Sequence, residues 1–172
     1  MKNTRKLVFA GVCLSLCIVL PFLTGQIPQV GSMLLPMHLP VLLCGFICGW
    51  PLGLLVGFIA PLLRSFLFSM PPMFPTAIAM AFELAAYGAI CGMLHALLPK
   101  KPPCLYASLL ASMLAGRAVW GVATALLLGG QYSWGAFAAG AFINAWPGIL
   151  LQMVLIPPLV LALEKAGLNK NK

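Results

Sequence analysis

The Lys and Arg residues of this chain are confined to a few places, and this distribution constrains the fold more than any other feature. Eight of the ten lie in the N-terminal tail, in a short loop near residue 100 and in the C-terminal tail, while Arg64 and Arg117 lie inside long apolar runs. With 62% hydrophobic and only 7% charged residues, the chain lacks the charged surface of a soluble domain. We therefore expect an all-α integral membrane protein in which residues 1–172 form a single membrane domain.

The net charge of +8 does not indicate a nucleic-acid partner. The basic residues flank apolar segments and form no patch interleaved with aromatic residues, so they suit anchors at the lipid surface. The basic N-terminus followed by an apolar run resembles a signal peptide, but no clear cleavage site follows it. We therefore expect this segment to stay in place as the first membrane helix.

The six cysteines are expected to be packing residues. Two pairs, Cys13 with Cys17 and Cys44 with Cys48, have the i, i+4 spacing that places both members on one helix face. No histidine follows at the spacing of a zinc site, and nearly all the cysteines lie within apolar stretches. The sequence therefore predicts no metal site and no cofactor.

Proline, glycine and charge divide the apolar sequence into six expected membrane-spanning helices. Their expected bounds are about 7–23, 39–50, 51–69, 76–98, 105–128 and 136–163. Trp50-Pro51 predicts a tight turn between the second and third spans, and the second is short enough to be broken or partly extended. Five spans remain an alternative if these two are misread. Gly45, Gly49, Gly53 and Gly57 recur every four residues across this turn, which favours close helix packing.

The basic residues predict the orientation of this bundle. With six spans, both termini and the loops after the second and fourth spans share one side of the membrane. The basic residues outside the apolar runs all fall on that side: Lys2, Arg5, Lys6, Lys100, Lys101, Lys165, Lys170 and Lys172. The positive-inside rule makes it the cytoplasmic side of the cell membrane.

Four polar residues are expected in the outer half of the membrane, each on a different helix: Arg64, Glu83, Arg117 and Asn144. A charged side chain at such a depth costs about 2.5–3.5 kcal/mol, so it faces the bundle and finds a partner. A purely structural Arg–Glu pair is one interpretation. However, one carboxylate cannot neutralise two guanidiniums, and the surplus positive charge favours a small anionic ligand.

Further candidate ligand contacts lie near these residues. Trp120 and Trp134 would provide apolar walls, although each of them, taken singly, suits an interfacial anchor or a packing residue better. His38 is either a ligand contact or a hydrogen-bond donor that structures the loop. The sequence carries no paired His/Glu zinc motif, no nucleophile elbow and no phosphate-binding loop, so we expect a protein that is not an enzyme and cannot itself use ATP.

The chain between residues 35 and 83 resembles a known family. The segment that begins at Leu35 reads LPMHLPVLLCGFICGWPLGLLVGF, and it is followed by Pro61-Leu-Leu-Arg-Ser and by Met70-Pro-Pro-Met-Phe-Pro-Thr-Ala. With the chain length, six-span layout and basic N-terminus, this sequence is similar to the substrate-binding S component of an energy-coupling factor (ECF) transporter.

The resemblance implies a six-helix bundle that binds a vitamin or similar micronutrient with high affinity, and in which the loop between the first two spans acts as a lid. It also implies two kinds of partner, a transmembrane coupling subunit and two cytoplasmic ATPases. The first span of the family carries an Ala-x-x-x-Ala-like face for the coupling subunit. This chain departs from that pattern, and its nearest equivalents are Ala10, Gly11 and Ser15. The Leu-Pro-Met-His-Leu-Pro stretch looks most like S components for pantothenate, with riboflavin and folate as alternatives.

Two other functions remain open at this point. A self-sufficient channel or small facilitator could be built on the same bundle, and a membrane scaffold would use Arg64, Glu83 and Arg117 only as pairing residues. Flux through vesicles that contain only this chain would distinguish the facilitator from a binding subunit.

Overall fold

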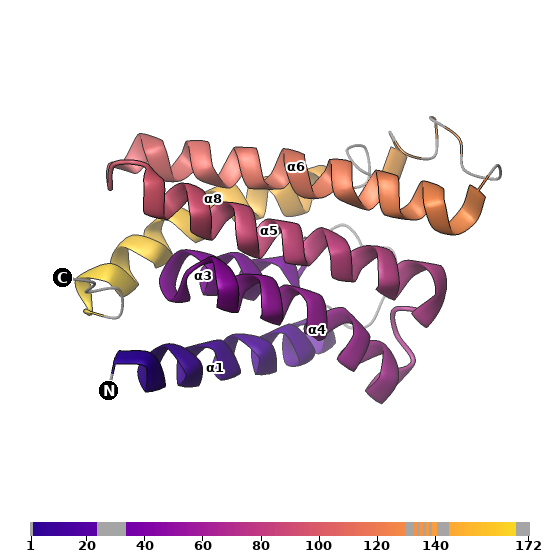
Figure 1. Cartoon of the computed structure of the whole chain (residues 1–172), viewed down its shortest axis with the longest axis horizontal. Coiled ribbons are helices and arrows are strands. Elements are labelled where there is room, and N and C mark those ends of the chain that lie inside the picture. The colour runs from indigo at the N-terminus through magenta and orange to yellow at the C-terminus, as the bar shows by residue number, and fades with distance from the viewer. Residues whose placement is uncertain are drawn as a thin grey trace.

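A computed structural model of the chain describes residues 2–23, 34–129, 133, 135, 137, 139–140 and 145–167. The described part is built of helices (Figure 1). The α-helices in chain order are α1 (Lys2–Leu23), α3 (His38–Cys48), α4 (Trp50–Phe68), α5 (Ile78–Leu97), α6 (Pro102–Leu128) and α8 (Trp146–Lys165). An irregular helical turn, η1 (Met73–Ala77), leads from α4 into α5.

Five helical segments among the described residues are long and apolar enough to cross a membrane. They are Asn3–Leu23, Trp50–Phe68, Met73–Leu97, Pro102–Leu128 and Trp146–Lys165. They agree to within a few residues with the first, third, fourth and fifth expected spans and with the second half of the sixth. The expected second span is the 11-residue helix α3, about 16 Å long, which covers only about half of a bilayer's hydrocarbon core.

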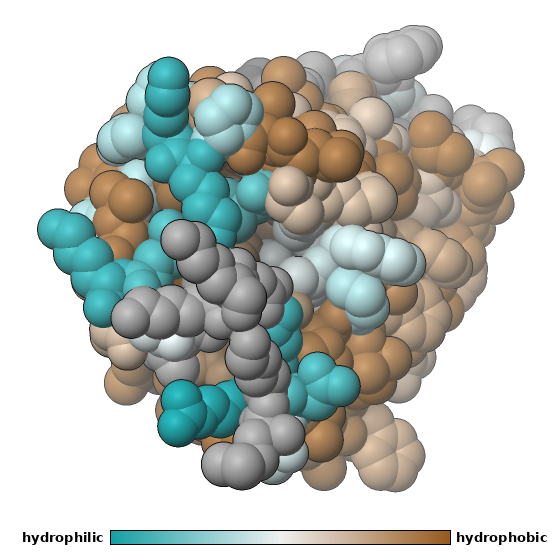
Figure 2. Space-filling view, turned by 60° about the vertical axis from the view of Figure 1, so that its left-hand side comes forward, coloured by the Kyte–Doolittle hydropathy of each residue, from teal (hydrophilic) through white to brown (hydrophobic). Residues whose placement is uncertain are grey.

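One end of the bundle carries the start of α1, the α5–α6 turn and the end of α8 (Figure 1). We call it the basic end, because Arg5, Lys6, Lys100, Lys101 and Lys165 lie in these segments. Figure 2 shows hydrophilic side chains gathered on this end, while the flanks behind are mostly hydrophobic. Apolar side chains face outward all along α1, as in Leu7 and Leu23, which suits contact with lipid.

Glycines hold α4 and α5 together at backbone contact. A Cβ atom added to Gly88 of α5 would lie 2.2 Å from the carbonyl oxygen of Gly53 on α4, and one added to Gly57 would lie 2.3 Å from that of Leu84. Gly45 of α3 meets α5 in the same way, since its Cβ would lie 2.6 Å from the Gly88 oxygen. We call this contact of α3, α4 and α5 the glycine seam. Three of the four glycines in the series, Gly45, Gly53 and Gly57, are thus confirmed in close helix packing, whereas Gly49 lies between α3 and α4 with a φ of 96°.

The short helix α3 is the most enclosed element of the described fold. It packs against α1, α4, α5 and α8, and most of its side chains, from His38 to Cys48, are buried. The backbone just before it, Leu35–Met37, is not helical, and Leu35 has a positive φ of 50°. Irregular backbone at membrane depth is stable only where protein surrounds it, which explains why α3 lies inside the bundle.

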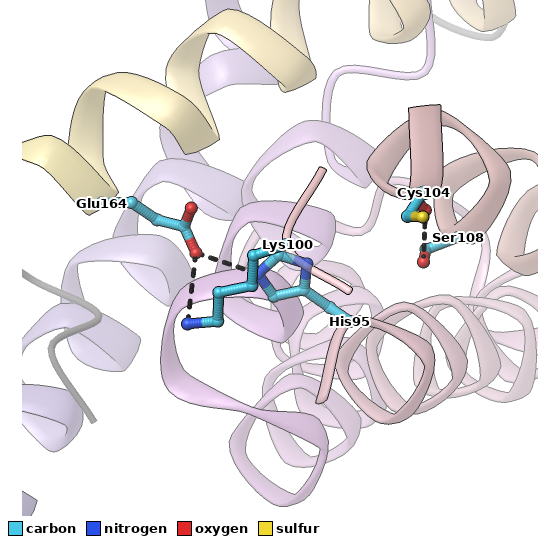
Figure 3. A network of polar contacts seen from close by, with 5 residues as sticks. All are labelled: His95, Lys100, Cys104, Ser108 and Glu164. Carbon is cyan, nitrogen blue, oxygen red and sulfur yellow. Dashed lines mark hydrogen bonds and ion pairs between the residues drawn. The ribbon is translucent and has the colours of Figure 1, made fainter. Parts of the chain in front are cut away.

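A small ionic network closes the basic end (Figure 3). The His95 Nε2 atom on α5 lies 3.0 Å from Glu164 Oε1 on α8, and Lys100 Nζ from the α5–α6 turn lies 3.9 Å from the same oxygen. The His95 ring also meets the Phe46 ring of α3 edge-on, with 5.2 Å between the ring centroids. The network therefore fastens α8 to α5 at this end.

Five of the six cysteines are buried, and all are free thiols. Cys13 and Cys17 of α1, Cys44 and Cys48 of α3, and Cys91 of α5 belong to one apolar core. The thiols of Cys17, Cys48 and Cys91 donate to backbone carbonyls, as Cys17 does to Met37. The interpretation of these residues as small packing groups is confirmed.

Candidate functional site

Glu83 is the centre of a group of buried polar side chains. Its Oε1 atom lies 3.0 Å from Arg117 Nη1 on α6 and 3.4 Å from His38 Nε2 on α3. Glu83 and His38 are each only 1% exposed, and Arg117 is 5% exposed. The structure thus brings together three of the predicted site residues from three different helices.

Tyr87 completes this group. It lies one turn after Glu83 on α5 and is fully buried. Its ring meets the His38 ring edge-on, with 5.1 Å between the centroids. We call His38, Glu83, Tyr87 and Arg117 the polar cluster.

The position of the polar cluster follows from the packing of α5 between α3 and α6 (Figure 1). Gly116 lets α6 approach α5 closely, because a Cβ at this position would lie 2.5 Å from Cδ2 of the Tyr87 ring. The next residue, Arg117, is thereby brought to Glu83. His38 reaches the same place because α3 begins in the interior of the bundle, and His38 is its first residue.

Several buried polar atoms of the cluster have no hydrogen-bond partner among the described residues. They are both ring nitrogens of His38, Glu83 Oε1, Tyr87 Oη and the Nε and Nη2 atoms of Arg117. The Glu83–Arg117 contact is therefore an ion pair without hydrogen-bond geometry, and the Glu83–His38 contact is a close polar approach that also lacks it. Such atoms are costly in a membrane interior unless a ligand or water satisfies them.

Gln152 of α8, which was not predicted from the sequence, also has buried polar atoms without a hydrogen-bond partner. It is fully buried, and neither its amide nitrogen nor its amide oxygen has a partner among the described residues. Helix α8 packs against α3 and α6, the helices that carry His38 and Arg117. Two features of the sequence could have indicated these residues. Gln152 is an amide within an otherwise apolar span, and Tyr87 lies four residues after Glu83, on the same helix face.

Arg64 lies elsewhere in the bundle, between α4 and α1. Its Nη1 atom donates to the carbonyl of Ile18, in the turn before Pro21. Its guanidinium lies 4.7 Å from the centroid of Phe22 and 5.6 Å from that of Phe68. These contacts are to a backbone carbonyl and two aromatic rings, and none of them involves Glu83. The expected meeting of Arg64 and Arg117 in one site is therefore not what the described contacts provide.

Trp120, predicted to line the ligand site, lies one turn beyond Arg117 on α6. Its ring stacks on Phe137 at 6.4 Å and would meet a Cβ at Gly140 at 2.6 Å. Trp120 therefore holds the segment around Phe137 and Gly140 against α6. The other two predicted contacts, Trp134 and Asn144, lie outside the described residues, as does most of the loop between the first two expected spans.

The three α1 residues predicted to contact a coupling subunit do not share one face. Gly11 and Ser15 are exposed, and the Ser15 hydroxyl donates to the Gly11 carbonyl over 3.0 Å. Ala10 is 4% exposed and belongs to the core. Of these three residues, Gly11 and Ser15 lie on the surface of α1 and Ala10 does not.

The chemistry available at the polar cluster is recognition by hydrogen bonds and charge. No group of three or more His, Cys, Asp or Glu side chains able to hold a metal ion occurs within the described ranges. The cluster offers one carboxylate, one guanidinium, one imidazole and one phenol, which together both donate and accept hydrogen bonds.

Comparison with known proteins identifies the family. Searches of curated proteins and of solved structures gave no match. A family profile described as "ECF transporter, substrate-specific component" matches residues 5–160. Since this match covers most of a multi-pass membrane chain whose interior carries an unsatisfied polar cluster, the chain belongs to the family of substrate-specific components of ECF transporters.

Proposed function

We propose that this chain is the high-affinity substrate-binding subunit of an ECF-type importer and that it captures a small vitamin or similar micronutrient at the polar cluster. The observation that carries the proposal is the set of buried, unpartnered polar atoms on His38, Glu83, Tyr87 and Arg117. A purely structural ion pair would be expected to satisfy its own donors, because each unsatisfied group costs about 1–3 kcal/mol. A bound ligand accounts for these atoms.

The family and the basic end support a proposal for the partners and the orientation. We propose that the basic end faces the cytoplasm of a cell whose plasma membrane the bundle spans, in agreement with the positive-inside rule. A transmembrane coupling subunit and two cytoplasmic ATPases would then drive delivery. The exposed residues Gly11 and Ser15 of α1 are the proposed contact with the coupling subunit.

Pantothenate is the first ligand to test, because the resemblance around His38 favours it. The argument for an anion from charge alone required Arg64 beside Arg117. Arg64 instead contacts Ile18, Phe22 and Phe68, so that argument is weaker than the sequence indicated. Riboflavin and folate remain candidates.

The proposal is tested by ligand binding and by transport, each with the purified full chain. A thermal-shift screen of vitamins, followed by calorimetry on the best hit, should give one-to-one binding with a submicromolar Kd. The chain reconstituted alone in lipid vesicles should show no substrate flux. Flux at ordinary facilitator rates would favour a self-sufficient transporter, and the absence of any binding by the folded protein would contradict the proposed function.

Arg64→Met is expected to lower stability while leaving ligand affinity within about twofold. The guanidinium of Arg64 stabilises the Ile18 carbonyl and two aromatic rings, contacts together worth about 2 kcal/mol. Thermal unfolding and calorimetry on the same sample measure the two effects separately. Loss of binding by a folded Arg64→Met protein would show that Arg64 belongs to the ligand site.

Gln152→Leu is expected to weaken ligand binding about tenfold without lowering the thermal midpoint. The amide of Gln152 has no partner among the described residues, so leucine removes an unsatisfied buried group from the apo protein, and only the complex loses contacts. Met153→Leu, on the next residue of α8, is the matched control and should alter neither quantity. Unchanged affinity in Gln152→Leu would place Gln152 outside the ligand site.

A further inference from the structure

The formal charges around the polar cluster are balanced. Glu83 and Arg117 form an ion pair, and no other charged residue is among the contacts described there. Arg64 lies against α1, and Glu164, the chain's second carboxylate, lies at the basic end. The segments outside the described residues contain charged side chains only in the C-terminal tail. The formal charges of Glu83 and Arg117 therefore cancel within the cluster.

The unpartnered atoms of the cluster include both donors and acceptors. Arg117 uses Nη1 toward Glu83, which leaves the Nε and Nη2 edge as a pair of parallel donors. In the neutral tautomer of His38 that carries its hydrogen on Nε2, Nδ1 is an acceptor, and neither nitrogen has a hydrogen-bond partner among the described residues. The Tyr87 hydroxyl can do either. This combination matches a ligand group that accepts and donates at neighbouring atoms.

Resting on the function proposed above, we propose that the group bound in the polar cluster is uncharged and both accepts and donates hydrogen bonds, as an amide, ureide or lactam does. Its carbonyl oxygen accepts from the Nε and Nη2 edge of Arg117, and its N–H donates to His38 Nδ1 or to Tyr87 Oη. A carboxylate would accept from Arg117 equally well. However, it would add an uncompensated negative charge beside Glu83 at a site only 1–5% exposed, where charge is poorly solvated.

The first test compares acid and neutral forms of the same small molecule on the purified wild-type chain at constant pH. Suitable pairs are pantothenate with panthenol, biotin with biotinamide, and nicotinate with nicotinamide, and riboflavin and folate serve as further neutral and anionic probes. For the pair that binds, the neutral form is expected to bind at least as tightly as the acid. If the group that differs between the two forms contacts the cluster, the neutral form should bind about tenfold more tightly. Tighter binding of the acid, or a best ligand that is folate, overturns the inference and leaves the proposed function intact.

The second test changes the charge of the cluster. Glu83→Gln leaves Arg117 without its partner, so the ratio of acid to neutral affinity should rise about tenfold or more in favour of the acid. Glu164→Gln changes the only other carboxylate, far from the cluster at the basic end, and should leave the ratio unchanged. The inference is contradicted if the Glu83→Gln protein binds both forms in the wild-type ratio. It is also contradicted if Glu83→Gln and Glu164→Gln shift the ratio equally. If Glu83→Gln does not fold, the wild-type comparison decides alone. If the folded wild-type chain binds no vitamin of any charge, the proposed function fails instead.

Discussion

Replacing Gly88 with alanine is expected to lower the thermal midpoint by about 6–12 °C, an effect of about 3 kcal/mol. The new Cβ would lie 2.2 Å from the carbonyl oxygen of Gly53 and 2.3 Å from its carbonyl carbon. Both are backbone atoms inside helices, so neither can turn aside as a flexible side chain would. Helices α4 and α5 must separate, and Glu83 and Tyr87 of α5 move with them. Ligand affinity should fall together with stability.

Gly11→Ala is the matched control, because it makes the same substitution inside another helix. A Cβ at Gly11 meets nothing within 4 Å. Alanine there should leave the midpoint unchanged or raise it slightly, since it favours a helix by up to about 1 kcal/mol over glycine. Similar midpoints for the two variants would contradict the glycine seam described here. Both are measured by thermal unfolding of the isolated chain in detergent or nanodiscs.

Replacing Arg117 with methionine is expected to abolish measurable ligand binding and to destabilise the chain by about 3–5 kcal/mol. Methionine fills a similar volume, so the loss comes from charge. Glu83 keeps only the 3.4 Å contact with His38 and becomes a buried carboxylate without a cationic partner. Calorimetry and thermal unfolding measure the two effects.

The double variant Glu83→Gln with Arg117→Met separates the two contributions. With both charges removed, most of the lost stability should return, because replacing a whole buried ion pair is often neutral or stabilising. Ligand binding should not return, since the Nε and Nη2 donors of Arg117 are absent. A double variant as unstable as the single one would mean that Arg117 acts through packing, and recovery of binding would exclude it from the ligand site.

The helices could be predicted closely from the sequence because their ends carry strong local signals. Trp50-Pro51 and the Pro-Lys-Lys-Pro-Pro stretch from Pro99 mark turns, and the structure has helix boundaries at both. The apolar run continues without interruption from α3 into α4, so hydropathy alone could not divide it. Trp50-Pro51 provided the division, and the short helix expected at 39–50 is the 11-residue helix α3.

The sequence indicated how far along its helix each candidate site residue lies, but not in which direction around the helix axis its side chain points. Glu83 and Arg117 were expected in the interior, and they meet there. His38 was expected in the loop before the second span, as a ligand contact or a loop-structuring donor, and the structure places it beside Glu83. Arg64 was expected with Glu83 and Arg117, yet its position around the axis of α4 directs it to α1. A helix turns by about 100° per residue, so depth says little about which neighbour a side chain contacts. In this chain the direction depends on the glycine contacts, which only the three-dimensional packing reveals.

The enclosed position of α3 limits how a ligand can leave the polar cluster. His38 is the first residue of α3, so the rest of this helix separates the cluster from the basic end. That helix is held by the glycine seam and by the edge contact of Phe46 with His95. A pore through the bundle would have to break these contacts in every transport cycle. Exit by the route of entry, after the whole subunit changes its orientation in the bilayer, would leave them intact, so under the proposed function the cost of delivery would fall on moving the protein through lipid.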